Sequence, residues 1–199
     1  MQEYSRMGSY VYRQIDFKHP SFLFILEDKL KGLLGGPFFY NLYLKTFGLN
    51  GSERVLDFGC GGGTGSVCLA KLLNTSGELT CVDVSKYWID KARHRLRRYG
   101  NVKCLVGDIR ELDIPESSFD VISIIHVVHD IAPTQRQSVA DRLASLLDRH
   151  GKLFIREPIK ESHGMPVSEI VTLLTNGGLC EAQANVSKSE YRGIFGYEN

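Results

Sequence analysis

Short apolar runs alternate with longer segments of mixed polarity from residue 54 onward, a rhythm that predicts strands separated by helices. Strands divided by helices of this length form a mainly parallel, doubly wound sheet. The last two runs lie close enough for a hairpin, which adds one antiparallel strand. The predicted fold class is therefore α/β, with helices on both faces of a seven-stranded, mostly parallel sheet. The expected strands are residues 55–58, 79–83, 102–106, 119–125, 153–156, 180–186 and 191–197. Helices are expected at about 65–73, 87–99, 134–147 and 167–174.

The first fifty residues follow another pattern, because they hold more than half of the aromatic side chains of the chain. They predict helices at about 21–34 and 37–47, broken at Gly35-Gly36-Pro37. We expect residues 1–50 to be an N-terminal helical cap and residues 51–199 to be the main domain.

Composition narrows the class of protein further. The chain is 43% hydrophobic and 24% charged with a formal net charge of +1, which makes no case for nucleic acid or an anionic membrane. No apolar run near the start resembles a secretory signal, so we expect a cytoplasmic protein without membrane insertion. The five cysteines include no CxxC pair, which argues against thiolate zinc sites and a disulfide framework.

A glycine-rich turn follows the first predicted strand and opens a helix, which is the context of a ligand site. The sequence Val55–Gly65 reads VLDFGCGGGTG, and glycine lets the backbone bend tightly and approach a ligand closely. No register gives the G-x-G-x-x-G spacing of dinucleotide sites, and the Lys-Ser or Lys-Thr of a P-loop is absent. The pattern present is Asp-x-Gly-x-Gly-x-Gly. Its acidic residue, Asp57, would repel a pyrophosphate and suits a cationic ligand or an amino group.

Two more acids end the next two predicted strands. Asp83 lies 20 residues after Gly63, where a carboxylate can accept hydrogen bonds from ribose hydroxyls, and Asp108 follows the third strand. Each acid by itself is equally well explained as a cap of the next helix or turn. Three acids in step with the glycine turn favour a binding site.

The chain resembles the class I S-adenosylmethionine-dependent methyltransferases, most closely the small-molecule branch that includes the ubiquinone- and menaquinone-type enzymes. The matching stretches are VLDFGCGGGTG, CVDVSKYWIDKAR, GDIRELDIPESSFDVISIIHVVHDI and LLDRHGKLFIREP, which cover about residues 54–158. The resemblance implies a Rossmann-like fold and transfer of a methyl group from S-adenosyl-L-methionine, leaving S-adenosyl-L-homocysteine. The first fifty residues carry no matching motif.

The resemblance also implies roles for single residues. Asp57 would lie near the amino group of the cofactor, Asp83 would bind both ribose hydroxyls, and Val84 would pack on the adenine. Asp108 and the backbone amide of Ile109 would contact the edge of the base. The residues implied to bind the cofactor are Asp57, Gly59, Cys60, Gly61, Gly63, Asp83, Val84, Asp108, Ile109 and Ile125.

Candidate acceptor and proton-transfer groups follow the fourth predicted strand. His126 and His129 are the candidate general bases. His126 is also a candidate for acceptor contact, and it differs from the small or polar residue that the family often has there. His129 is a candidate for acceptor contact, as are Tyr10 and Tyr12 of the cap, whose rings could face the sulfonium. A helix-start role with satisfied polar contacts is the favoured explanation of these histidines, and we expect no metal site.

Several alternatives stay open at this stage. The expected partner is a small-molecule acceptor, while RNA or protein methylation, a non-catalytic cofactor-binding module and a nicotinamide oxidoreductase are the competing hypotheses. The basic run at 91–98 could bind RNA, but a solvated helix face is favoured at this net charge. The sequence leaves the acceptor and the oligomeric state open, a homodimer included.

Overall fold

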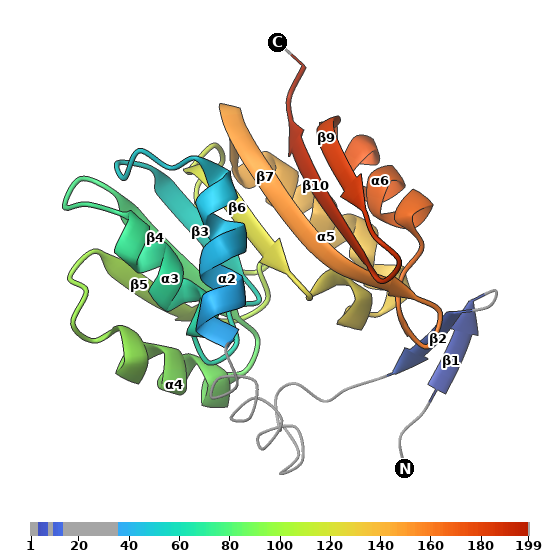
Figure 1. Ribbon diagram of the computed structural model, residues 1–199, viewed down its shortest axis with the longest axis horizontal. Coiled ribbons are helices and arrows are strands. Elements are labelled where there is room, and N and C mark those ends of the chain that lie inside the picture. The colour runs from blue at the N-terminus through green and yellow to red at the C-terminus, as the bar shows by residue number, and fades with distance from the viewer. Residues whose placement is uncertain (1–3, 8–9, 14–35, 199) are drawn as a thin grey trace. The chain divides into compact units, whose positions relative to one another are not determined.

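The computed structural model of the protein describes residues 4–7, 10–13 and 36–198 (Figure 1). The chain divides into two compact units, one of residues 16–108 and the other of residues 1–15 together with 109–199.

The unit of residues 16–108 contains a parallel sheet of order β5-β4-β3. Its strands are β3 (Arg54–Phe58), β4 (Glu78–Asp83) and β5 (Val102–Val106), and β4 pairs with both neighbours in parallel. Val55 to Phe58 are all buried, as expected of a strand covered on both faces. The helices are α2 (Gly36–Leu44), the 3-10 turn η1 (Lys45–Phe47), α3 (Thr64–Leu72) and α4 (Lys86–Leu96).

The second unit contains strands of order β6-β7-β10-β9. Strand β6 (Phe119–Ile125) is parallel to β7 (Leu147–Lys160), and β10 (Glu190–Gly196) lies antiparallel between β7 and β9 (Cys180–Val186). Helices α5 (Pro133–Leu146) and α6 (Val167–Asn176) pack against each other. The short elements η2 (Val128–Asp130) and β8 (His163–Gly164) follow β6 and β7.

All seven predicted strands are present, and the antiparallel C-terminal hairpin is confirmed. Strand β7 is longer than predicted because its register with β6 shifts between Phe119 and Val121 and lets pairing start at Leu147. Gly151 lies inside this irregularity, where a Cβ would approach the backbone oxygens of Asp120 and Asp148 to 3.0 Å. Gly151 therefore lies at a bulge within strand β7.

The N-terminal segment differs from the helical cap that we expected. Residues Tyr4–Met7 (β1) and Tyr10–Arg13 (β2) form an antiparallel pair of strands, and β2 lies beside η2 and β8. The alternation Tyr10-Val11-Tyr12 carries this signal, because aromatic and β-branched residues favour strands. The predicted helix at 37–47 is confirmed as α2 with η1, whereas the helix expected at 21–34 lies outside the described residues. The division of the chain at residue 50 stays a prediction.

Candidate cofactor and acceptor sites

The glycine turn after β3 is held against β4 by backbone hydrogen bonds. The N–H groups of Gly59 and Cys60 both donate to the carbonyl of Val82, at 2.8 and 3.1 Å. Gly59, Gly61 and Gly63 have φ angles of 70°, 52° and 80°, a left-handed conformation that disfavours any residue with a Cβ. A Cβ on Gly61 would meet no described atom within 4 Å, so the turn leaves open space on this side. The glycines of the Asp-x-Gly-x-Gly-x-Gly pattern thus shape a backbone that a ligand can approach closely.

The carboxylate of Asp83 ties the end of β4 to this turn. Its Oδ2 accepts the N–H of Gly61 and its Oδ1 accepts the N–H of Ser85, both at 2.9 Å. Burial raises the pKa of Asp83 above its ordinary value, although the two amide hydrogen bonds act in the opposite direction. Asp83 therefore shapes the turn itself, a role that sequence reasoning did not foresee.

The other predicted cofactor residues of this unit lie at the same edge of its sheet. Asp57, the penultimate residue of β3, is only 5% exposed and accepts a 2.6 Å hydrogen bond from the hydroxyl of Ser66. Val84 follows β4 and is 40% exposed. The N–H of Gly107 donates to the carbonyl of Asp83, which brings the start of the Asp108 loop to the end of β4. The structure therefore brings together the predicted residues from the carboxyl ends of β3, β4 and β5.

Arg95 is a residue of this region that sequence reasoning assigned to a solvated helix face. Its Nη1 donates to the carbonyl of Gly62 at 2.6 Å and contacts the hydroxyl of Thr64 at 2.8 Å. Neighbouring cations of α4 are engaged elsewhere: Lys86 and Arg93 pair with Asp90. The basic run thus contributes one arginine to the glycine turn, which no sequence motif indicates.

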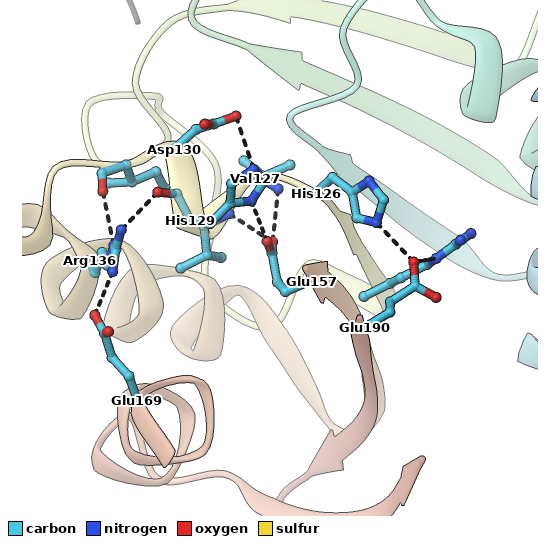
Figure 2. Close-up of polar contacts among 11 residues, drawn as sticks. His126, Val127, His129, Asp130, Arg136, Glu157, Glu169 and Glu190 are labelled. Carbon is cyan, nitrogen blue, oxygen red and sulfur yellow. Dashed lines mark hydrogen bonds and ion pairs between the residues drawn. The ribbon is translucent and has the colours of Figure 1, made fainter. Parts of the chain in front are cut away.

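In the second unit, His126 directly follows β6 and has a strained conformation. Its φ is 57°, a left-handed value that costs a non-glycine residue about 1 kcal/mol, and its N–H donates to the carbonyl of Arg156 at 2.8 Å. The imidazole side chain is 44% exposed, and its Nε2 lies 3.1 Å from Oε1 of Glu190 at the start of β10 (Figure 2). Residues held in such conformations often belong to functional sites.

Glu190 connects the ends of three strands. It accepts hydrogen bonds from Arg156 of β7 at 2.6 Å and from Arg192 of β10 at 2.8 Å, besides its contact with His126. Burial acts to raise its pKa, but the hydrogen bonds from these three groups lower the pKa of Glu190 to about 2. The carboxylate therefore stays ionised, and it holds the ring of His126 at this edge.

His129 lies deeper, against a carboxylate that no motif singled out. Its Nδ1 is 2.6 Å from Oε2 of the fully buried Glu157, while Oε1 of Glu157 accepts the N–H groups of Val127 and Val128 at 2.8 Å each. Figure 2 shows Glu157 reaching from β7 into the loop that follows β6. The side chain of His129 is only 4% exposed, so the two histidines occupy different environments despite their spacing.

The pKa values of His129 and Glu157 are shifted in the directions that favour an ionised pair. Burial acts to lower the pKa of His129, but the hydrogen bond and the charge of Glu157 outweigh it and leave this pKa above its ordinary value. Burial acts in the opposite direction on Glu157, whose pKa is nevertheless lowered, first by the hydrogen bond from His129. Oδ2 of Asp130 lies 3.5 Å from Nε2 of His129, and the ring of His163 lies 4.7 Å from the His129 ring.

The remaining predicted site residues lie at or near strand ends, in the glycine turn and on β2. Ile125 ends β6, Ile109 is buried with 1% exposure, and Cys60 is half-buried in the glycine turn. Tyr10 and Tyr12 lie on β2, and their side chains are outside the described part of the structure. Among the described residues, no three His, Cys, Asp or Glu side chains are placed to share a metal ion. Within the same residues, no helix is long and apolar enough to cross a membrane.

Comparisons with known proteins point to one family. A family profile described as "Methyltransferase domain" matches residues 55–151. Demethylmenaquinone methyltransferase of Staphylococcus aureus is 31% identical over 81 residues, which are 41% of this chain and 34% of that protein. The chain thus spans about a third of the length of such curated relatives.

Solved structures share the fold at low sequence identity. Magnesium protoporphyrin IX methyltransferase from Synechocystis PCC 6803, solved with bound SAM, has a TM-score of 0.68 at 19% identity, covering 92% of this chain and 88% of its own. The [4+2]-cyclase SpnF has a TM-score of 0.66 at 18% identity, covering 75% and 60% respectively. These similarities confirm the predicted Rossmann-like fold. Residues 55–151 are therefore similar to a methyltransferase domain, and the fold around them is Rossmann-like.

Proposed function

We propose that this protein transfers a methyl group from S-adenosyl-L-methionine to a small-molecule acceptor. The observation that carries the proposal is the left-handed glycine turn, open at Gly61 and flanked by acids at the ends of three parallel strands. A menaquinone-type relative and a porphyrin methyltransferase of the same fold support a small-molecule acceptor.

The described residues fit the proposed cofactor at chemically distinct points. The open face of Gly61 admits the amino-acid portion, beside the buried carboxylate of Asp57, which suits an ammonium group. Each carboxylate oxygen of Asp83 accepts one amide and keeps a second lone pair for a ribose hydroxyl. The exposed side chain of Val84 offers an apolar surface to the adenine, and Asp108 with the Ile109 amide would read its edge.

The chain's contribution to the reaction is alignment and control of charge. The bound cofactor supplies the activated methyl group, which an acceptor nucleophile takes by in-line displacement. His126, which follows β6, would contact the acceptor, as would Tyr10 and Tyr12 of β2. The exposed ring of His126, held by Glu190, is the candidate base for an acceptor that must lose a proton.

Titration calorimetry with S-adenosyl-L-homocysteine tests the cofactor part of the proposal. We expect micromolar binding of this ligand and none of NADH. Replacing Asp83 by alanine would remove both the ribose contact and the Gly61 amide contact, so Asp83→Asn, which keeps one acceptor oxygen, is the informative variant. Binding of NADH in preference to S-adenosyl-L-homocysteine would contradict the proposal and favour an oxidoreductase.

Turnover assays with different methyl acceptors distinguish the competing functions. A non-catalytic module would bind S-adenosyl-L-methionine without forming S-adenosyl-L-homocysteine with any quinone, phenol or porphyrin acceptor. An RNA or protein methyltransferase would turn over only with a macromolecular acceptor. The internal pairing of Lys86, Arg93 and Arg95 on α4 weakens the case for RNA.

A further inference from the structure

The guanidinium of Arg95 lies against the glycine turn from the side of α4. Its Nη1 is 2.6 Å from the carbonyl oxygen of Gly62 and 2.8 Å from Oγ1 of Thr64, the first residue of α3. Trp88, Ala92 and Arg95 are spaced i, i+4 and i+7, so they share one face of α4.

That face of α4 packs against Gly62 and Gly63 of the turn. A Cβ on Gly63 would lie 3.0 Å from Cα of Ala92, and one on Gly62 would lie 3.3 Å from the ring of Trp88. Such close approach leaves no room for side chains at these positions, and it places the guanidinium directly on the Gly62 carbonyl. Helix α4 therefore packs directly against the glycine turn.

Arg95 fixes one peptide group of the turn. The peptide between Gly62 and Gly63 is planar, with its carbonyl and its N–H pointing in opposite directions. Arg95 binds the carbonyl, and the N–H of Gly63 donates to the carbonyl of Cys60 at 3.0 Å. Because both ends are held, the peptide cannot rotate, although glycine on either side would otherwise permit it.

Folding stability alone is a poor explanation for a cation here. Thr64 and Gly63 begin α3, and a positive charge beside a helix N-terminus opposes the helix dipole. No described side chain caps this helix, so an acidic or hydroxyl cap would stabilise α3 better than the nearby guanidinium does. The contact instead preserves the shape of the turn.

We propose that Arg95 is a positioning residue for cofactor binding, which acts by locking the Gly62–Gly63 peptide in its ligand-ready orientation. The inference rests on the proposed role of the glycine turn in holding S-adenosyl-L-methionine. Without the guanidinium, the turn samples other conformations, and binding must select the competent one at a cost in affinity.

The test is S-adenosyl-L-homocysteine affinity, measured by calorimetry for Arg95→Ala, Arg95→Lys and the control Arg97→Ala. Arg97 is an exposed arginine of the same helix segment that contacts His94, so its variant matches the charge change. We expect Arg95→Ala to weaken binding by about tenfold or more, the size of losing a charged hydrogen bond, and Arg97→Ala to stay within about twofold. Arg95→Lys should recover part of the loss, because an ammonium can donate to the same two oxygens.

Thr64→Val provides a second variant that leaves Arg95 in place. If both residues act through one contact, their effects on affinity should be less than additive in the double variant. Melting temperatures measured in parallel separate positioning from folding, since a purely structural role predicts lower stability with unchanged affinity in the folded protein.

The outcomes are distinguishable. Tight binding by the wild-type protein with unchanged affinity in Arg95→Ala overturns this inference and leaves the proposed function standing. Equal losses in Arg95→Ala and Arg97→Ala overturn it too, because they indicate a general charge effect. Absence of binding by the wild-type protein overturns the proposed function and this inference with it. Should Arg95→Ala fail to fold, unchanged affinity in both Arg95→Lys and Thr64→Val overturns the inference.

Discussion

At the scale of single residues, backbone conformation and buried charge determine the two candidate sites. Gly61 has a positive φ and open space beside it, so its lack of a side chain serves conformation and ligand access together. Glu157 is fully buried and satisfies two backbone amides and one imidazole. Such a group is costly to disturb, because any partner left behind loses its hydrogen bond away from water.

Gly61→Ala should separate conformational strain from ligand access. Alanine at φ 52° costs about 1 kcal/mol, and its Cβ would occupy the space proposed for the cofactor. Gly48 is a matched control, because it has φ 65° and a Cβ there would also meet no described atom within 4 Å. We expect similar losses in the free energy of unfolding for both variants, but a loss of S-adenosyl-L-homocysteine binding only for Gly61→Ala. Equal affinity in the two variants would contradict the placement of the ligand.

Glu157→Gln should lower the free energy of unfolding by about 2 kcal/mol near neutral pH, because the variant loses the ionic bond to His129. The pKa of His129 is raised, so its contribution is present below about 6.5 and is lost as pH rises through the folded-state pKa. The pKa of Glu157 is lowered, so its contribution is present above about 4.5 and is lost as pH falls.

The stability difference between wild type and Glu157→Gln should therefore be largest between about pH 4.5 and 6.5 and shrink on either side. Urea denaturation at a series of pH values measures it, with Glu161→Gln, an exposed glutamate, as the control. A difference that does not vary with pH would show that the pair is not ionised.

At the scale of elements, the candidate site residues lie at the ends of strands and on one face of helix α4. The carboxyl ends of β3, β4 and β5 bring the glycine turn and two acids together, and the ends of β6 and β7 with the start of β10 bring His126 to Glu190. Strand β10, close to the C-terminus, pairs with both β7 and β9 and contributes buried aromatic side chains. Tyr191 and Phe195 on it are fully buried, and Gly193 between them leaves room for both rings.

Gly193→Ala should destabilise the C-terminal hairpin. A Cβ at this position would lie 2.7 Å from the ring atoms of both Tyr191 and Phe195, and neither buried ring can move freely. Overpacking of this kind costs about 2 kcal/mol, measurable as a lower midpoint of urea unfolding. Gly100→Ala, where a Cβ would meet no described atom within 4 Å, should leave that midpoint almost unchanged. Similar midpoints for both variants would show that the strand can adjust.

At the scale of the whole molecule, similar proteins share the fold but leave the acceptor undetermined. A methyltransferase and a cyclase both match this architecture closely, so the fold alone is compatible with different chemistry. Cofactor binding can be measured on the full chain through its thermal stability, because any ligand that binds only the folded state stabilises that state.

S-adenosyl-L-homocysteine should raise the melting temperature of the full chain. At a hundred times the dissociation constant, binding adds about 2.7 kcal/mol, which corresponds to about 5–10 °C for a protein of this size. NADH at the same concentration should give no shift. Differential scanning calorimetry measures both, and equal shifts with the two ligands would argue against a site specific for S-adenosyl-L-methionine.

Features that depend on residues close together in the chain could be predicted from the sequence. The periodicity of apolar positions located all seven main strands, and the Asp-x-Gly-x-Gly-x-Gly spacing located the turn, because a local conformation needs local residues. Contacts between side chains that are far apart in the sequence depend on the tertiary structure. Arg95 contacts a carbonyl 33 residues away, Glu157 binds an imidazole 28 residues away, and Glu190 reaches His126 across 64 residues. Such pairs depend on strand register and on which face of a helix is buried, and neither is encoded in the spacing of the residues concerned.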